Sequence, residues 1–220
     1  AGKFFRRRSI EHIEGELMDL KEKHNIDLIW NITDTLLTMD PEEFDEFCDM
    51  QERVGLEYFA QTRPETLTEY QAKRLVDSGC VKLNMGVEHG SDEFRRKHIG
   101  RVYDNELAIN AFKICREVGL DTTCNFIMGY PYETMDYCWE SVEMAKRIES
   151  DNINAFIFTP YHGTPLRQTC VDAGFISDDL IVSMNFGTED TSSYLDMPPP
   201  YMSKEDIQYM FNNFVSFVYS

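Results

Sequence analysis

The segment VKLNMGVEHGS, residues 81–91, decides the fold class of this chain. It starts as an apolar run, and Gly90 and Ser91 then lead into a stretch with helical spacing. An apolar strand that passes directly into a helix is the repeating unit of parallel sheets covered by helices. The segment therefore predicts an α/β fold.

The same unit recurs on both sides of this segment. Four more apolar runs predict strands, at residues 26–32, 56–61, 120–128 and 153–159. Helical spacing and capping residues predict the helices before and between them, at residues 9–23, 40–55, 68–78, 105–117 and 135–149. The chain begins with a helix, so we expect that one strand is missing in front of it. The crossovers would curl the mostly parallel sheet towards a barrel or into a doubly wound sheet.

The pattern weakens towards the end of the chain. Residues 177–200 are polar and proline-rich, which predicts a loop. Ser203 then caps a last helix with an apolar stripe. We expect residues 1–170 to form the barrel core, and residues 171–220 to pack on it as a loop and helical extension of the same domain.

The composition of the chain disfavours several classes of function. The 220 residues include 39 acidic and 21 basic side chains, for a formal net charge of −18. Such a surface disfavours general binding to nucleic acids or anionic membranes. No apolar run reaches the roughly 18 residues of a membrane span. The six cysteines are scattered without a CxxC pair, which favours free thiols in a reducing compartment and hence a cytoplasmic protein.

Parallel α/β folds bind ligands beyond the carboxyl ends of their strands. Glu88 stands at such an end between two glycines, which suits a carboxylate that accepts hydrogen bonds from a sugar diol. Arg63 and Arg101 could each bind a carboxylate. Ser91 could equally serve only as a helix N-cap.

Two other interpretations of these strand ends stay open. Glu88, His89 and His162 could surround a metal ion, as in a TIM-barrel aldolase or a metal-dependent hydrolase. Alternatively, the chain could be a non-catalytic α/β binding domain. Three ligands that converge in the structure would favour the metal site.

The order of several motifs resembles that of the radical S-adenosylmethionine (SAM) superfamily, particularly the group that often carries a cobalamin-binding domain. Among them, residues 86–91 are similar to the family's ribose motif, G-I/V-E-S-G-S. The resemblance covers about residues 4–170, and its motifs lie at residues 5–9, 34–35, 63–68, 86–91, 125–134 and 160–166.

The resemblance implies a partial TIM-like (β/α)6 barrel that lacks its first strand, with a mostly parallel sheet and outer helices. It also implies a SAM site at the carboxyl rim of this barrel. Glu88 would bind the ribose hydroxyls, within the motif that ends at Ser91. Asp34 would approach the methionine end of SAM, whose carboxylate would bind to Arg101 or Arg63. The adenine would pack on the segment after the fourth predicted strand, and the implied contacts there are Ile127, Gly129 and, nearby, Tyr161.

The chain also departs from the family pattern. The family's three cluster cysteines, spaced CxxxCxxC, are absent, and His89, His162 and Thr33 stand where the family usually has Ser, Pro and Asp. We expect a fragment that begins after the cluster loop and is inactive by itself. The full-length protein would bind SAM and a [4Fe–4S] cluster, with cobalamin in a further domain. The substrate stays open.

A missing first strand has a physical consequence. The strand at residues 28–32 would become an exposed edge, which invites pairing with another chain. We therefore expect a homodimer formed through this edge.

Overall fold

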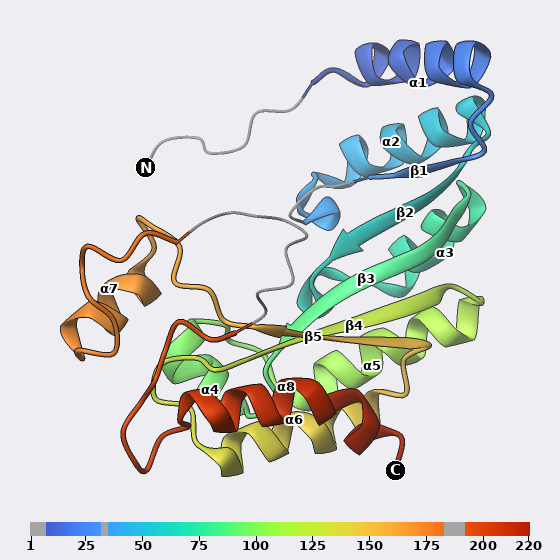
Figure 1. The fold of residues 1–220 in the computed structure, drawn as a ribbon. Helices are drawn as coiled ribbons and strands as arrows, with labels where there is room; N and C mark the ends of the chain where they lie inside the picture. The colour runs from blue at the N-terminus through green and yellow to red at the C-terminus, as the bar shows by residue number, and fades with distance from the viewer. Residues whose placement is uncertain (1–7, 32–34, 183–191) are drawn as a thin grey trace. The chain divides into compact units, whose positions relative to one another are not determined.

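The computed structural model describes residues 8–31, 35–182 and 192–220. Its strands form one five-stranded sheet in the order β1-β2-β3-β4-β5 (Figure 1). The pairs β1–β2, β2–β3 and β4–β5 are parallel. The predicted α/β fold with a parallel sheet is confirmed, and its strands are β1 (Leu28–Trp30), β2 (Glu57–Thr62), β3 (Cys80–Glu88), β4 (Asp121–Met128) and β5 (Asn152–Ile157).

The chain divides into two compact units. The first unit comprises Ala1–Met85 and Ala111–Thr122, and the second unit comprises Gly86–Asn110 and Thr123–Ser220. The boundary therefore falls within β3 and β4, and the proposed division of the chain at residue 170 stays a prediction.

The first unit holds β1 and β2 together with three helices that contact one another in series. α1 (Ile10–His24) contacts α2 (Pro41–Val54), which also contacts α3 (Glu69–Asp77). The caps read from the sequence are present, since the side chain of Ser9 accepts from His12 N and Thr68 forms a capping box with Gln71. Two short 3₁₀ turns were not predicted, η1 (Leu36–Thr38) and η2 (Pro64–Thr66).

The second unit carries the remaining helices. α4 (Asp92–Phe94) continues directly into a π-helical turn, η3 (Arg95–Ile99), and α5 (Asn105–Val118) begins in this unit and ends in the first. The others are α6 (Met135–Ile148), α7 (Pro165–Asp172) and α8 (Lys204–Val218).

α8 is the predicted C-terminal helix, and it packs against α6 and β5 (Figure 1). Three residues of the predicted stripe are fully buried, Ile207, Met210 and Phe214. Within residues 8–31, 35–182 and 192–220, the helices are too short or too polar to span a lipid bilayer.

Burial alternates along the strands, although the sequence suggested continuously apolar ones. On β3, Met85 and Val87 are buried, whereas Gly86 and Glu88 are half-buried. On β4, Phe126 and Met128 are buried and Ile127 is half-buried. Successive side chains of a strand point to opposite faces. One face is therefore sealed in the core, and the other, which carries Glu88 and Ile127, stays accessible.

Candidate functional site

Glu88 is the last residue of β3 and has an unusual backbone. Its φ of +70° lies in the left-handed region, which few residues other than glycine adopt. Gly86 makes room for the carboxylate, because a Cβ at that position would lie 2.3 Å from Glu88 Oε1. A non-glycine residue held in this region is a mark of functional sites. The two observations single out the Glu88 carboxylate.

Arg101 holds this carboxylate in place. Its Nη2 donates to Glu88 Oε1 at 2.9 Å, and its Nη1 donates to the carbonyl oxygen of Gly86 at 2.7 Å. The two side chains are 16% and 17% exposed, so the ion pair is largely shielded from water. Arg101 was predicted to bind a carboxylate, and the carboxylate that it contacts here is that of Glu88.

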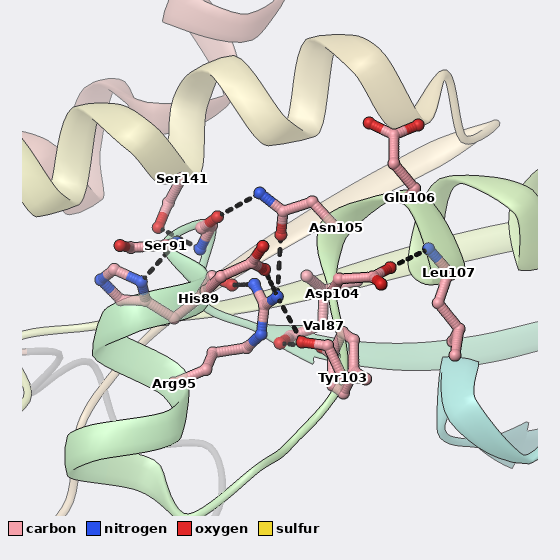
Figure 2. Close-up of polar contacts among 12 residues, drawn as sticks. Val87, His89, Ser91, Arg95, Tyr103, Asp104, Asn105, Glu106, Leu107 and Ser141 are labelled. Carbon is pink, nitrogen blue, oxygen red and sulfur yellow. Dashed lines mark hydrogen bonds and ion pairs between the residues drawn. The ribbon is translucent and has the colours of Figure 1, made fainter.

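The backbone on both sides of Glu88 is anchored through its carbonyl groups (Figure 2). Tyr103 Oη donates to Val87 O at 2.7 Å, and Asn105 Nδ2 donates to Gly90 O at 2.8 Å. Arg95 Nη1 donates to the carbonyl oxygen of His89 at 2.5 Å. Side chains from one short segment therefore fix the backbone on both sides of Glu88, which preorganises its position.

Arg95 is the centre of this network, and the sequence did not single it out. It is fully buried, its guanidinium carbon lies 4.3 Å from the centre of the Tyr103 ring, and its Nη2 also donates to Asn105 Oδ1 and pairs with Asp92. The sequence shows Arg95 beside Arg96 and Lys97, and nothing in that basic run marks which side chain is buried. Only packing makes the distinction.

Gly90 allows α6 to approach the same loop. Its N–H donates to Ser141 Oγ at 2.8 Å, and a Cβ there would lie 2.3 Å from the carbonyl oxygen of Glu140. The neighbouring Ser91 is buried and precedes α4, but its side chain makes no capping hydrogen bond. Gly90 is therefore required for close packing, whereas Ser91 contributes through its backbone.

His89 and Glu133 form a buried pair behind the loop. His89 Nε2 lies 3.1 Å from Glu133 Oε1, and the N–H of Ser91 donates to His89 Nδ1 at 3.0 Å. Since Nδ1 accepts a hydrogen bond, the ring proton is on Nε2, which donates to the carboxylate. Both nitrogens of His89 are thus engaged within the protein.

This arrangement removes the metal-site interpretation. A ligand histidine needs a ring nitrogen for the metal, and His89 offers none. His162 is exposed. Among the described residues, no three His, Cys, Asp or Glu side chains gather as a metal site would require. The metal-dependent hydrolase alternative therefore has no support.

The carboxylates also influence Tyr130, which follows β4. Burial, and then the nearby Glu88 and Glu133, raise the pKa of Tyr130 well above its ordinary value. The phenol is therefore neutral at physiological pH. Tyr130 is itself buried, so it adds no charge beside the Glu88–Arg101 pair.

The other predicted site residues are distributed as follows. Ile127 is half-buried on β4, and Gly129, with a φ of +78°, directly follows β4 and begins the turn after it. Tyr161 is 44% exposed in the turn after β5. These three residues belong to the second unit, as does Glu88.

Two predicted residues are not placed with them. Arg63 belongs to the first unit and is exposed, where its carbonyl oxygen accepts a hydrogen bond from Thr66 Oγ1 at 2.8 Å. Asp34 lies outside the described residues, as does Thr33.

The cysteines do not fit an iron–sulfur cluster. All six are buried free thiols. Burial raises the pKa of Cys48 and Cys170 to about 11 and that of Cys80 to about 12, and it raises the pKa of Cys124 and Cys138 well above the ordinary range. Cluster ligands are thiolates. Thiols held neutral at scattered positions cannot supply such a set.

Comparison with known families identifies the chain. The model of the radical SAM superfamily matches residues 1–145, about two thirds of the sequence. The chain belongs to the radical SAM superfamily. Its membership supports an enzymatic role, and the family resemblance read from the motifs is confirmed.

Curated relatives are more distant and considerably longer. An uncharacterised methyltransferase of Pyrococcus horikoshii is 28% identical over 186 residues, which cover 84% of this chain and 39% of the relative. The cytidylyl-2-hydroxyethylphosphonate methyltransferase of Streptomyces wedmorensis is 23% identical, over 81% of this chain and 35% of the relative. The chain thus spans less than half the length of these relatives.

Solved structures share the fold. The radical SAM methyltransferase TsrM of Kitasatospora setae, with cobalamin and a [4Fe–4S] cluster bound, has a TM-score of 0.61 at 17% identity. The match covers 75% of this chain and 34% of TsrM. This likeness confirms the partial barrel core predicted from the motifs.

Proposed function

We propose that this protein binds SAM in the second unit, at the carboxyl ends of β3 and β4, and that the Glu88 carboxylate accepts hydrogen bonds from the ribose hydroxyls. The observation that carries the proposal is the geometry of Glu88. Its left-handed backbone, the space left by Gly86 and the pairing with Arg101 all serve to hold one carboxylate at the accessible face. A carboxylate is acceptor-only, which suits a vicinal diol.

The adenine side of the proposed site follows β4. Ile127 offers an apolar, half-buried surface, and the turn at Gly129 brings backbone groups beside it. Tyr161 and Ser91 belong to the same proposed site through the family motifs. For the methionine end, Asp34 and Arg63 stay candidates. The pairing of Arg101 with Glu88 favours an orienting role for Arg101 over direct contact with the SAM carboxylate.

In this family, SAM supplies a 5′-deoxyadenosyl radical after one-electron reduction by a [4Fe–4S] cluster. The buried, scattered cysteines of this chain do not fit that cluster. The part that we assign to the described residues is to bind the nucleoside, orient it and shield it from water. We infer that these residues alone do not cleave SAM.

We propose methyl transfer as the reaction class of the full-length protein, because the relatives that match more than 80% of this chain are named as methyltransferases. Both curated relatives described above, and TsrM, are named as methyltransferases, and TsrM holds cobalamin. We therefore propose a methyltransferase, with cobalamin as its candidate second cofactor because TsrM, which shares the fold, holds cobalamin. Six buried free thiols support a cytoplasmic location.

The test is equilibrium binding of SAM to the full-length protein, reconstituted anaerobically with iron and sulfide. Glu88→Gln keeps the side-chain size but replaces an acceptor oxygen by a donor, so we expect the Kd for SAM to rise about 10- to 100-fold. Glu42→Gln, at an exposed position in the first turn of α2, is the control and should bind as the wild type does.

Two results would contradict the proposal. The first is a reconstituted wild-type protein that neither binds SAM nor produces 5′-deoxyadenosine. The second is a Glu88→Gln variant with unchanged affinity, which would leave the family assignment intact but remove Glu88 from the ribose site.

A further inference from the structure

We propose that His89 and Glu133 are positioning residues, which tie the loop that carries Glu88 to the turn that follows β4. This inference rests on the proposed SAM site, because these two segments hold its ribose and adenine contacts. Neither side chain was assigned a role in SAM binding by the motifs, and in the family position 89 is usually a serine.

The Glu133 carboxylate accepts hydrogen bonds from the backbone of the turn after β4. Its Oε2 accepts the N–H of Gly129 at 2.5 Å and that of Tyr130 at 3.0 Å. The side chain is fully buried. A buried carboxylate is tolerated only when donors surround it, so these two amides and the glutamate depend on one another.

The second oxygen of the same carboxylate reaches the other loop. Glu133 Oε1 accepts from His89 Nε2 at 3.1 Å, and His89 directly follows Glu88 in the chain. A single carboxylate therefore joins the backbone at Gly129 and Tyr130 to the residue beside the proposed ribose ligand. A serine hydroxyl lies one bond beyond Cβ, whereas His Nε2 lies three bonds beyond it, so the family's usual residue could not span this gap.

The surroundings of His89 make it the donor in its hydrogen bond to Glu133. The N–H of Ser91 donates to Nδ1, which keeps the ring proton on Nε2. The ring also stacks on Phe94, with 4.3 Å between ring centres. His89 therefore cannot exchange its donor for an acceptor without losing the contact to Ser91, and the bridge requires an acceptor at position 133.

The two contacts of His89 can be separated by a matched pair of substitutions. In His89→Gln, the amide nitrogen reaches about as far as Nε2 and can still donate to Glu133. In His89→Asn, the shorter amide can replace Nδ1 towards Ser91 but cannot reach Glu133. We expect the full-length His89→Asn variant to bind SAM about 10-fold more weakly than the wild type, and the His89→Gln variant to stay within about threefold.

A second set of variants reverses the polarity of the bridge. In Glu133→Gln, the amide oxygen can still accept from the N–H groups of Gly129 and Tyr130. The amide nitrogen then faces His89 Nε2–H, so two donors meet. We expect SAM affinity to fall about 10-fold. The double variant His89→Gln/Glu133→Gln can restore a hydrogen bond, because the amide of residue 89 can turn its oxygen towards residue 133. Recovery of affinity in the double variant is not expected if each side chain only fills space.

The outcomes distinguish this inference from the proposed function. Thermal unfolding first confirms that each variant is folded, and Kd for SAM is then measured by calorimetry. If the wild type binds SAM and Glu88→Gln weakens it, but His89→Asn binds as the wild type does, the positioning role is wrong and the proposed function stands. If the wild type does not bind SAM, the proposed function fails, and this inference fails with it. If Glu133→Gln does not fold, the comparison of His89→Asn with His89→Gln still decides.

Discussion

At the residue scale, the candidate site depends on side chains that the reacting ligand would not touch. Glu88 is held by Arg101, its loop is held by Arg95, Tyr103 and Asn105, and Glu133 supports the neighbouring turn. Binding sites require this kind of support, because a carboxylate on a loose loop cannot hold a ligand at a defined distance. The position of the Glu88 carboxylate therefore depends on these supporting residues.

Arg95 provides the sharpest test of stability at this scale. Arg95→Met keeps much of the side-chain volume but leaves the carbonyl groups of His89 and Tyr103 without their donor and Asp92 without its partner. We expect the free energy of unfolding to fall by about 3 kcal/mol. Arg96→Met, at the exposed neighbouring position, should change it by less than about 0.5 kcal/mol. Urea denaturation followed by circular dichroism measures both, and equal midpoints would show that Arg95 is not a structural centre.

At the element scale, α8 is part of the architecture of the second unit. It contacts α6 and β5, and its residue Ile207 packs against the turn after β4. The main-chain N–H of Met202, just before α8, donates to the carbonyl oxygen of Glu133 at 2.9 Å. α8 and the residue before it therefore stabilise the turn after β4, to which we assign the adenine contact.

Two glycines with the same backbone conformation test this contact. Gly129 and Gly163 have φ values of +78° and +79°, so alanine at either position suffers the same backbone strain. A Cβ at Gly129 would also lie 2.9 Å from Ile207 Cγ2, whereas a Cβ at Gly163 would meet nothing within 4 Å. We expect Gly163→Ala to cost about 1 kcal/mol and Gly129→Ala about 1–3 kcal/mol more.

Thermal and urea unfolding of the two variants measure this difference. Because the shared backbone strain cancels between them, the excess for Gly129→Ala reports the packing of α8 on the turn. Equal destabilisation would mean that Ile207 moves aside freely and that α8 does not support the turn.

At the scale of the whole molecule, β1 lies at one end of the sheet order. It pairs with β2, and in the part of the chain that the structure describes it has no second strand neighbour. Trp30 and Leu28 are 61% and 43% exposed. They line a groove of about 970 Å³ between α1, β1 and α2, and glutamates at positions 11, 16, 43 and 46 also line it. An open strand edge with apolar side chains favours association.

We therefore predict that the chain forms a homodimer through β1, and that Trp30→Lys shifts it to a monomer. Light scattering over a range of concentrations measures the molar mass. The acidic groove should repel its copy, so added salt should strengthen the dimer. Tyr70→Lys, at an exposed position on α3, is the control and should leave the molar mass unchanged. A wild-type chain that stays monomeric at high concentration would contradict the prediction.

The succession of helices and strands and the family can be read from the amino-acid sequence. Ser9, Thr68 and Ser203 cap the helices where expected, because capping depends on neighbours within four residues. The apolar runs marked all five strands, and the ordered motifs identified Glu88. These signals are local, so they can be read along the chain.

The contacts that hold the candidate site became visible only in the folded chain. It selected Arg95 over Arg96 for burial, directed Arg101 to Glu88, and joined His89 to Glu133, which lies 44 positions along the chain. It also removed His89 from any metal site by engaging both of its nitrogens. Such contacts depend on which loops meet after the strands pair. The spacing of residues along the sequence does not predict which loops these are.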